Sequence, residues 1–287
     1  MRLLKFLRYD VEEGIIKYWY KYLIVILLVI VACISSDAKY ECVEELFGEK
    51  NSFFEYGFDF FLGKLPYHFS NSNITIFEPP YIWVSFYIAL LLCMGNFIEE
   101  SINNYGGMLI LKSKSRAYWW ISKCIWVSLI NVVNWMLFWI SNISFAWIRN
   151  GQISINNDVF ITSTKYGAVI SQSSNIYRMF LTVSMPLLVG IACSLLNMVM
   201  SLVIGSFGSM MIMIALVIFS TYYATRINPY EYALIIRYFE QDKAQAFTPL
   251  HPLNGVFYLI CLSVFMMILG YVIIRKKNLI IRKYEYF

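Results

Sequence analysis

The sequence predicts an all-α, polytopic membrane protein with six transmembrane helices and an amphipathic helix at the N-terminus. The first reason is composition: the 287 residues are 59% hydrophobic and 14% charged, whereas about a quarter of the residues in a soluble domain are charged. The mean hydropathy is +0.60. The second reason is that residues 179–225 contain no Lys, Arg, Asp, Glu or His. One helix of that length would run roughly 70 Å, against a hydrocarbon core of about 30 Å, so the stretch predicts two helices that cross the bilayer and return.

Residues 1–17 predict an amphipathic helix on the membrane surface. Its apolar residues recur every four positions, and basic residues that favour an anionic surface lie among them (Leu3, Leu7, Val11, Ile15; Arg2, Lys5, Arg8). No small-residue cleavage site follows the first apolar run, so a removed signal peptide is not expected. The first span is predicted at about 19–35, where Tyr and Trp residues at its start suit the membrane interface.

A long polar loop is predicted at 36–80, on the outer side. It is rich in acids, but its many aromatic residues indicate short helices that lie on the membrane or cap the next spans. Cys33 and Cys42 are near each other in the sequence, and whether they pair stays open. The other four cysteines fall in or beside apolar spans, where cysteine behaves as a small hydrophobe.

The second and third spans are predicted at about 81–97 and 118–148. A polar connection at 98–117 joins them on the cytoplasmic side. Lys123 lies close enough to the inner edge of the third span to extend its ammonium group to the interface. A Ser- and Asn-rich outer loop at 149–178 follows the third span.

The uncharged stretch is predicted to hold the fourth and fifth spans, at about 179–203 and 209–223. Glycines and serines interrupt the apolar runs between them and indicate the turn. Pro186 is expected to kink the first arm near its outer end. An outer polar loop with several turn-forming prolines is predicted at 224–254.

The sixth span is predicted at about 255–274, and a basic tail follows it. With the N-terminus inside, the cytoplasmic segments have 14 Lys and Arg against 6 Asp and Glu, and the outer segments have 9 against 12 (cytoplasmic: 1–21, 96–123, 275–287). Because Lys and Arg are enriched in cytoplasmic loops, we expect both termini in the cytoplasm and the chain in the cell membrane. The basic residues are scattered along membrane-flanking segments, so nucleic acid is not an expected partner.

The sequence contains no enzymatic motif. It has no HExxH, GxSxG, Walker A or GxGxxG pattern, and its two histidines, His68 and His251, fall in predicted outer loops. Apart from Lys123, the predicted spans contain essentially no charged residue, although an embedded enzyme or an ion-driven carrier would need such residues there. We therefore expect a protein that is not an enzyme and that binds no metal or cofactor directly.

Small and polar residues in the spans indicate close helix packing. Gly190 and Ser194 are four positions apart, as are Ser201 and Gly205, and this spacing lets helices approach closely. The contacts are expected within one bundle, at a seam between subunits, or at the wall of a substrate pathway. Three asparagines in the spans are candidates for hydrogen bonds across helices (Asn131, Asn134, Asn197).

The cytoplasmic connection at 98–117 has two interpretations. Two acids precede a glycine pair and an apolar run, and three basic residues follow (Glu99, Glu100; Lys112, Lys114, Arg116). One interpretation is a solvated loop whose positive charge only sets the topology. The other is a short interfacial helix that is presented to a cytoplasmic partner.

The segment from Gly107 to Cys124, GMLILKSKSRAYWWISKC, resembles a loop of ABC-2-type permease subunits from Gram-positive bacteria, where the pattern is G-x-x-x-L-x-S-x-S-R-x-x-W-W-x-S-K. The architecture of the whole chain is similar too, with an amphipathic N-terminal helix, six spans and a basic tail. The resemblance implies the fold of the ABC-2, or type V, exporters. That family includes exporters of peptide antibiotics, immunity permeases, and exporters of lipids or polymers.

In that family, the loop between the second and third spans carries the coupling helix that docks on an ATPase subunit. The resemblance therefore implies that Glu99, Glu100, Lys112, Lys114 and Arg116 couple the chain to a separate ATPase that uses ATP and Mg²⁺. It also implies a second permease subunit, identical or homologous. The expected function is the export of an amphipathic peptide, antibiotic or lipid-like substrate across the cell membrane of a Gram-positive bacterium. The alternative is a membrane scaffold or assembly factor that transports nothing; the substrate itself and the direction of transport stay open.

Overall fold

The computed structural model describes residues 2–48, 50–67, 77–95, 101, 116–151, 159–239 and 248–276. Throughout these ranges the regular elements are helices. In chain order they are α1 (Arg2–Val11), a π-helical turn η1 (Glu12–Ile16), α2 (Tyr20–Phe47), α3 (Phe53–Leu62), α4 (Tyr81–Met94), α7 (Arg116–Asn150), α8 (Val159–Tyr166), α9 (Ala168–Ser171), α10 (Asn175–Ile204), α11 (Ser206–Tyr222), two 3₁₀ turns η2 (Pro229–Ala233) and η3 (Ile235–Tyr238), and α12 (Pro252–Lys276). The predicted all-α class is therefore confirmed for this part of the chain.

Four helices are long and apolar enough to cross a membrane, as expected of a membrane protein. They cover Lys21–Phe47, Arg116–Asn150, Asn175–Ile204 and Pro252–Lys276. α4 and α11 are apolar but have only 14 and 17 residues, which is about 21 and 26 Å against a hydrocarbon core of about 30 Å. Six crossings stay a prediction, in which α4 and α11 are the two short ones.

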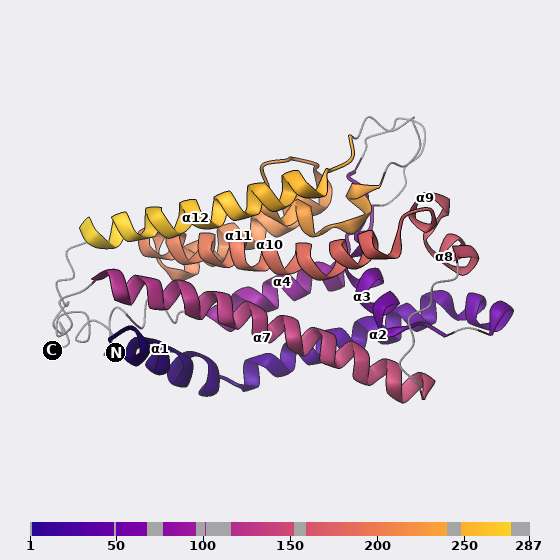
Figure 1. The fold of residues 1–287 in the computed structure, drawn as a ribbon, viewed down its shortest axis with the longest axis horizontal. Helices are drawn as coiled ribbons and strands as arrows, with labels where there is room; N and C mark the ends of the chain where they lie inside the picture. The colour runs from indigo at the N-terminus through magenta and orange to yellow at the C-terminus, as the bar shows by residue number, and fades with distance from the viewer. Residues whose placement is uncertain are drawn as a thin grey trace.

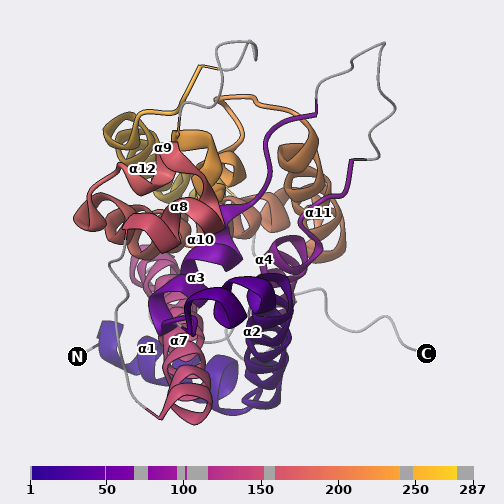
Figure 2. The same cartoon turned by 90° about the vertical axis from the view of Figure 1, so that its right-hand side faces the viewer.

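The long helices run beside one another along the long axis of the molecule (Figure 1). α1, the start of α7 and the end of α12 lie at one end, which we call the α1 end. α3, α8 and α9 lie at the opposite end, the α3 end, together with the last turns of α2 and α7 (Figures 1 and 2). The basic residues that begin α7 and end α12 therefore lie at the α1 end, the end that the charge distribution predicts to be cytoplasmic (Arg116, Arg275, Lys276).

The N-terminal helix packs on the start of α7. Its Phe6 and Asp10 are buried. The π-helical turn that follows brings Gly14 against the indole of Trp126, where a Cβ would stand 2.5 Å from Nε1. The helix predicted to lie on the membrane surface is thus also a packing element of the bundle. The sequence pattern does not predict this packing, because a charged residue such as Asp10 is expected at the surface unless its partner on α7 is known.

α2 is longer than the predicted first span. It continues through the acidic segment that was expected to be a loop from residue 36, and it ends only at Gly48, whose φ of 69° is a left-handed conformation that suits glycine. Cys33 and Cys42 therefore lie nine positions apart in one helix, roughly 14 Å along its axis, too far for a disulfide. All six cysteines are reduced, so the open question of pairing is answered in the negative.

α3 supplies aromatic side chains to the centre of the core. Ser52 and Glu55 form a capping box that begins the helix, with the Ser52 N–H donating to the Glu55 carboxylate at 2.8 Å. Phe60 and Phe61 pack on Phe86 of α4 and Phe138 of α7, with ring centroids 5.0–5.7 Å apart. α3 is one of the short helices expected in this segment, and its buried aromatic side chains agree with the expectation that such helices cap the next spans (Figure 2).

The uncharged stretch forms the predicted helical hairpin. α10 and α11 are joined by Gly205 alone, whose φ is 83°, so the turn is tighter than the predicted gap from 203 to 209. A left-handed φ at this position favours glycine because a Cβ would crowd the following carbonyl. Pro186 lies inside α10, and the hydroxyl of Tyr87 donates to its carbonyl oxygen at 3.4 Å.

Residues 228–239 fall in the polar loop predicted at 224–254, but most of them are shielded from solvent. Almost all of them are buried against α10, α11 and α3. Arg237 explains the burial, because its guanidinium donates to the carbonyl oxygens of Ser220 at 2.5 Å and of Thr221 and Tyr223 at 3.4 Å. These carbonyl groups lie at the C-terminal end of α11, where they have no hydrogen-bond partner within the helix. The segment therefore closes the end of α11, which its prolines alone do not predict.

Candidate functional site at the start of α7

The first turns of α7 form a buried ion pair with α1. The side chains of Lys123 and Asp10 are 1% and 2% exposed, and Nζ of Lys123 lies 2.5 Å from Oδ1 of Asp10. The hydroxyl of Ser122 donates to the other oxygen of the same carboxylate. The prediction that Lys123 extends to the membrane interface is wrong, because α1 folds back onto α7 and places a carboxylate within reach.

The ion pair fixes α1 to α7 mainly through the penalty for breaking it. Two charges that leave water each lose several kcal/mol of hydration, and their attraction roughly offsets that loss. Removing one partner leaves the other charge buried and uncompensated, which costs about 3–5 kcal/mol. Trp119 adds a contact, since Nζ of Lys123 lies 5.4 Å from its ring centroid. α1 and the start of α7 therefore behave as one unit.

Two side chains of α7 clamp the end of α12. Nη1 of Arg116 donates to the carbonyl oxygens of Ile274 at 3.1 Å and Arg275 at 2.7 Å, in the last turn of α12. One turn further along α7, Nε1 of Trp120 donates to the carbonyl oxygen of Met267 at 2.8 Å. A cation at a helix C-terminus is stabilised by the partial negative charge of the unpaired carbonyls.

Gly270 makes room for the Trp120 indole. A Cβ at residue 270 would stand 2.0 Å from Cζ2 of Trp120, closer than any real contact. α12 therefore needs a residue without a side chain at the point where the indole crosses. The sequence shows a glycine in a predicted span, but only the tertiary structure shows which side chain it accommodates.

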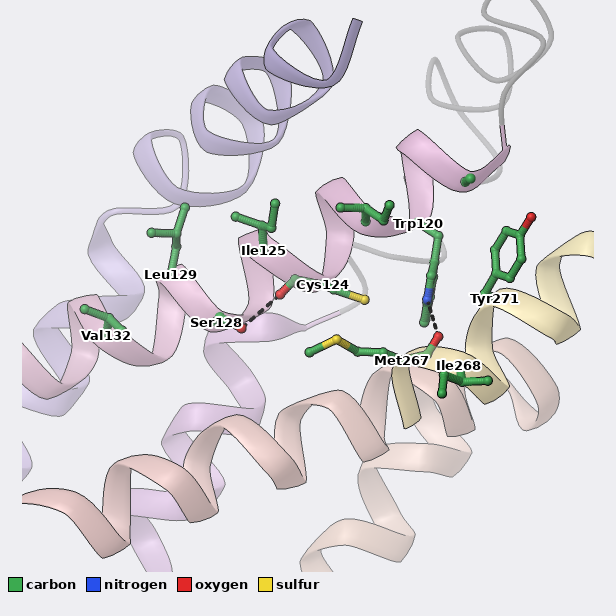
Figure 3. Close-up of a pocket in the computed structure, with 11 residues that line it drawn as sticks. Trp120, Cys124, Ile125, Ser128, Leu129, Val132, Met267, Ile268 and Tyr271 are labelled. Carbon is green, nitrogen blue, oxygen red and sulfur yellow. Dashed lines mark hydrogen bonds between the residues drawn. The ribbon is translucent and has the colours of Figure 1, made fainter. Parts of the chain in front are cut away.

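Beside these clamps lies an apolar groove of about 510 Å³ between α7 and α12 (Figure 3). Trp120, Ile121 and Cys124 line it from α7, and Ile268 and Tyr271 line it from α12. No charged residue is among the described residues of its lining. The hydroxyl of Ser128 is satisfied by the Cys124 carbonyl at 3.0 Å, so the groove suits a hydrocarbon.

Of the five residues implied in coupling to an ATPase, Arg116 alone falls within the described part of the chain. Glu99, Glu100, Lys112 and Lys114 lie outside the described residues. Arg116 begins α7, and part of its guanidinium is engaged with α12. Its side chain therefore joins the end of the predicted coupling segment to two helices.

The two small-residue pairs have different surroundings. A Cβ on Gly190 would stand 2.9 Å from Oδ1 of Asn131, and the hydroxyl of Ser194 accepts a hydrogen bond from the same asparagine at 2.9 Å. This pair lies in a contact between α10 and α7 within one chain, which confirms the predicted hydrogen bond of Asn131 across helices. Ser201 donates to the Met198 carbonyl of its own helix at 2.7 Å, and a Cβ on Gly205 would meet nothing within 4 Å.

Further buried ion pairs lie towards the α3 end, and sequence reasoning missed them. Nζ of Lys165 lies 3.2 Å from Oε1 of Glu55, with both side chains buried. Nη1 of Arg237 lies 3.3 Å from Oε1 of Glu231. Burial raises the pKa of Glu231 and lowers the pKa of Arg237 to about 10. The first pair joins residues 110 positions apart, so no local spacing could have indicated it.

The described residues contain no group of three or more His, Cys, Asp or Glu that could hold a metal ion. The charged groups at the start of α7 are engaged with α1 and α12. The arrangement there can join helices and accept apolar groups.

One family model, described as "Protein of unknown function (DUF2705)", matches residues 28–280. The match begins inside α2 and ends after α12, so it includes the clamps and the groove but not Asp10. Searches of curated proteins and of solved structures gave no significant match.

Proposed function

This chain belongs to the DUF2705 family, and we propose that it is the membrane-spanning permease subunit of an ABC-type exporter of the ABC-2 class. In this proposal a separate ATPase hydrolyses ATP with Mg²⁺, and two permease subunits, identical or homologous, form the pathway. The cargo is an amphipathic peptide, antibiotic or lipid-like molecule. The chain crosses the cell membrane of a Gram-positive bacterium six times, with both termini in the cytoplasm. The resemblance of residues 107–124 to the coupling loop of such permeases supports the proposal, as do the four long apolar helices.

The position of Arg116 carries the proposal. Residues 98–117 are the proposed coupling loop, and Arg116 connects the end of this loop to the last turn of α12 while it begins α7. Trp120 makes a second connection between the same helices at 2.8 Å. A push from an ATPase on the loop would therefore displace α7 and α12 together, as a rigid body.

Asp10 extends this unit to α1. Its ion pair with Lys123 joins α1 to the half of α7 that is nearest the loop. Three elements that are far apart in the sequence thus form one body at the predicted cytoplasmic end. ATP binding and hydrolysis in a partner would shift that body between two positions, because a ligand that binds one conformation more tightly increases the population of that conformation.

Purification from native membranes tests the partner. The tagged chain should co-purify with a soluble protein that carries a Walker A loop, identified by mass spectrometry. Lys114→Glu should weaken the association with the ATPase or uncouple ATP hydrolysis from transport. Lys64→Glu is the matched control, because it makes the same charge change in an exposed residue of the segment predicted to lie outside. Recovery of no ATPase, or equal behaviour of the two variants, would contradict the proposal.

A non-transporting scaffold is the second candidate, and one observation favours it. Only 28% and 17% of the apolar windows of α2 and α12 are buried, which leaves broad apolar faces for contact with other membrane proteins. If the chain co-purifies with integral membrane proteins and with no ATPase, the scaffold is the better interpretation.

A further inference from the structure

We propose that the groove between α7 and α12 binds one anionic phospholipid, with an acyl chain in the groove and its phosphate at Arg275 and Lys276. This site does not depend on the export function. The proposal rests on the shape of the groove, its apolar lining and the charge at its α1 end.

The groove has the length and chemistry of a site for an acyl chain. Its α7 wall extends from Ala117 to Val132, roughly 22 Å along the helix axis. One leaflet supplies about half of a hydrocarbon core of about 30 Å, so an acyl chain can lie along most of this wall. Ile121 and Ile268 remain 45% and 59% exposed, and they have no apolar cover among the described residues.

The Trp120 indole argues against a helix of a second copy as the occupant. The bond from Nε1 to the Met267 carbonyl holds α7 and α12 at side-chain distance, and Figure 3 shows the indole lying between the two helices. A helix with side chains is about 10–12 Å wide. A space of about 510 Å³ that is crossed by an indole admits a flexible chain more readily than a helix.

The charge at the α1 end selects the headgroup. Arg275 and Lys276 follow Tyr271 by about one turn, at the end of the groove, and both are exposed. Neither forms an ion pair with a carboxylate among the described residues. Arg116 adds a third positive charge, since it donates to the Arg275 carbonyl at 2.7 Å. Basic residues next to apolar grooves between transmembrane helices bind anionic lipid headgroups.

Native mass spectrometry of the full-length protein in detergent tests the site. The protein is titrated with phosphatidylglycerol, which is anionic, or with phosphatidylcholine, which is zwitterionic. Phosphatidylglycerol should bind with a stoichiometry of one and in clear preference to phosphatidylcholine. Arg275→Gln with Lys276→Gln should weaken phosphatidylglycerol binding about thirty-fold, from about 1 kcal/mol per basic residue and 1.4 kcal/mol per factor of ten. Arg8→Gln in α1 with Lys17→Gln, directly after the π-helical turn, removes the same charge from the N-terminal segment and should leave the affinity unchanged.

A blocking variant tests the acyl-chain half. Ile268→Trp should fill the groove and abolish the bound lipid, whereas Ile260→Trp, on an exposed part of α12 outside the lining, should retain it. Gel filtration and thermal unfolding verify that each variant is folded. The proposal would be overturned if the two lipids bind equally well, or if the Arg8→Gln, Lys17→Gln control loses as much affinity as the variant at Arg275 and Lys276. Lipid retained in Ile268→Trp would also overturn it. A dimer in which the groove is covered and no lipid binds would overturn it as well.

Discussion

The ion pair between Asp10 and Lys123 offers a direct measure of how firmly α1 is held on α7. At 2.5 Å and an effective dielectric constant of about 20, the attraction of two unit charges is about 7 kcal/mol, most of which offsets their desolvation. Asp10→Asn keeps the shape of the side chain but leaves the ammonium group buried without its counter-charge. We expect it to cost about 3–5 kcal/mol, which corresponds to a fall in Tm of roughly 10 °C for a chain of this size.

The assay is thermal unfolding of the purified protein in detergent, followed by tryptophan fluorescence. Asp10→Asn combined with Lys123→Met should recover most of the lost stability, because replacing a whole buried ion pair with uncharged groups is often neutral. Glu13→Gln, which breaks an exposed pair of the same N-terminal segment, should leave Tm unchanged. The reasoning is refuted if Asp10→Asn unfolds at the wild-type temperature. It is refuted equally if the losses of the two single variants add in the double variant.

Two further predictions concern glycine positions, and a third concerns the orientation of the chain in the membrane. Gly270→Ala should destabilise the protein by about 1–3 kcal/mol, because its Cβ would overlap the Trp120 indole; the same thermal scan checks this, and a wild-type Tm would contradict it. Gly205→Ala should lower the free energy of unfolding by about 1–2 kcal/mol, because φ at this residue is 83°. Gly208→Ala should change the stability little, because its Cβ would meet its nearest neighbour at 3.6 Å. An equal loss of stability in the two variants would argue against backbone strain at Gly205. Cys42, exposed at the end of α2 that is predicted to lie outside, should react in intact cells with a maleimide that does not cross membranes, and Cys42→Ser should abolish the labelling. Protection of Cys42 in intact cells with labelling only after lysis would reverse the predicted orientation.

Much of the fold could be predicted because it depends on local pattern. A long run without charge requires helices in lipid, and a glycine between two apolar runs indicates where the chain turns, so the α10–α11 hairpin was located to within a few residues. The lower accuracy at α2 has a physical reason. Its last turns are acidic, and a helix that leaves the hydrocarbon region continues for as long as its backbone bonds are made, whatever the polarity of its side chains.

The candidate site could be predicted only in part. Arg116 is one of the five residues that the resemblance implies in coupling, and the structure shows that its guanidinium bonds to α12. Asp10 was missed as a partner of Lys123, and Gly270 was missed as the neighbour of Trp120. In each case the two residues are more than 100 positions apart, and no periodicity relates them.

Hydropathy and charge are properties of each segment alone, so they suffice to predict the helical membrane class, the positions of the long apolar helices and the basic character of one end. Contacts between segments decide which charges are buried together, why residues 228–239 are shielded from solvent, and where α7 and α12 leave a groove. A buried ion pair, a capped helix end or a groove requires two segments, and the free energy that fixes each one appears only when both are in place.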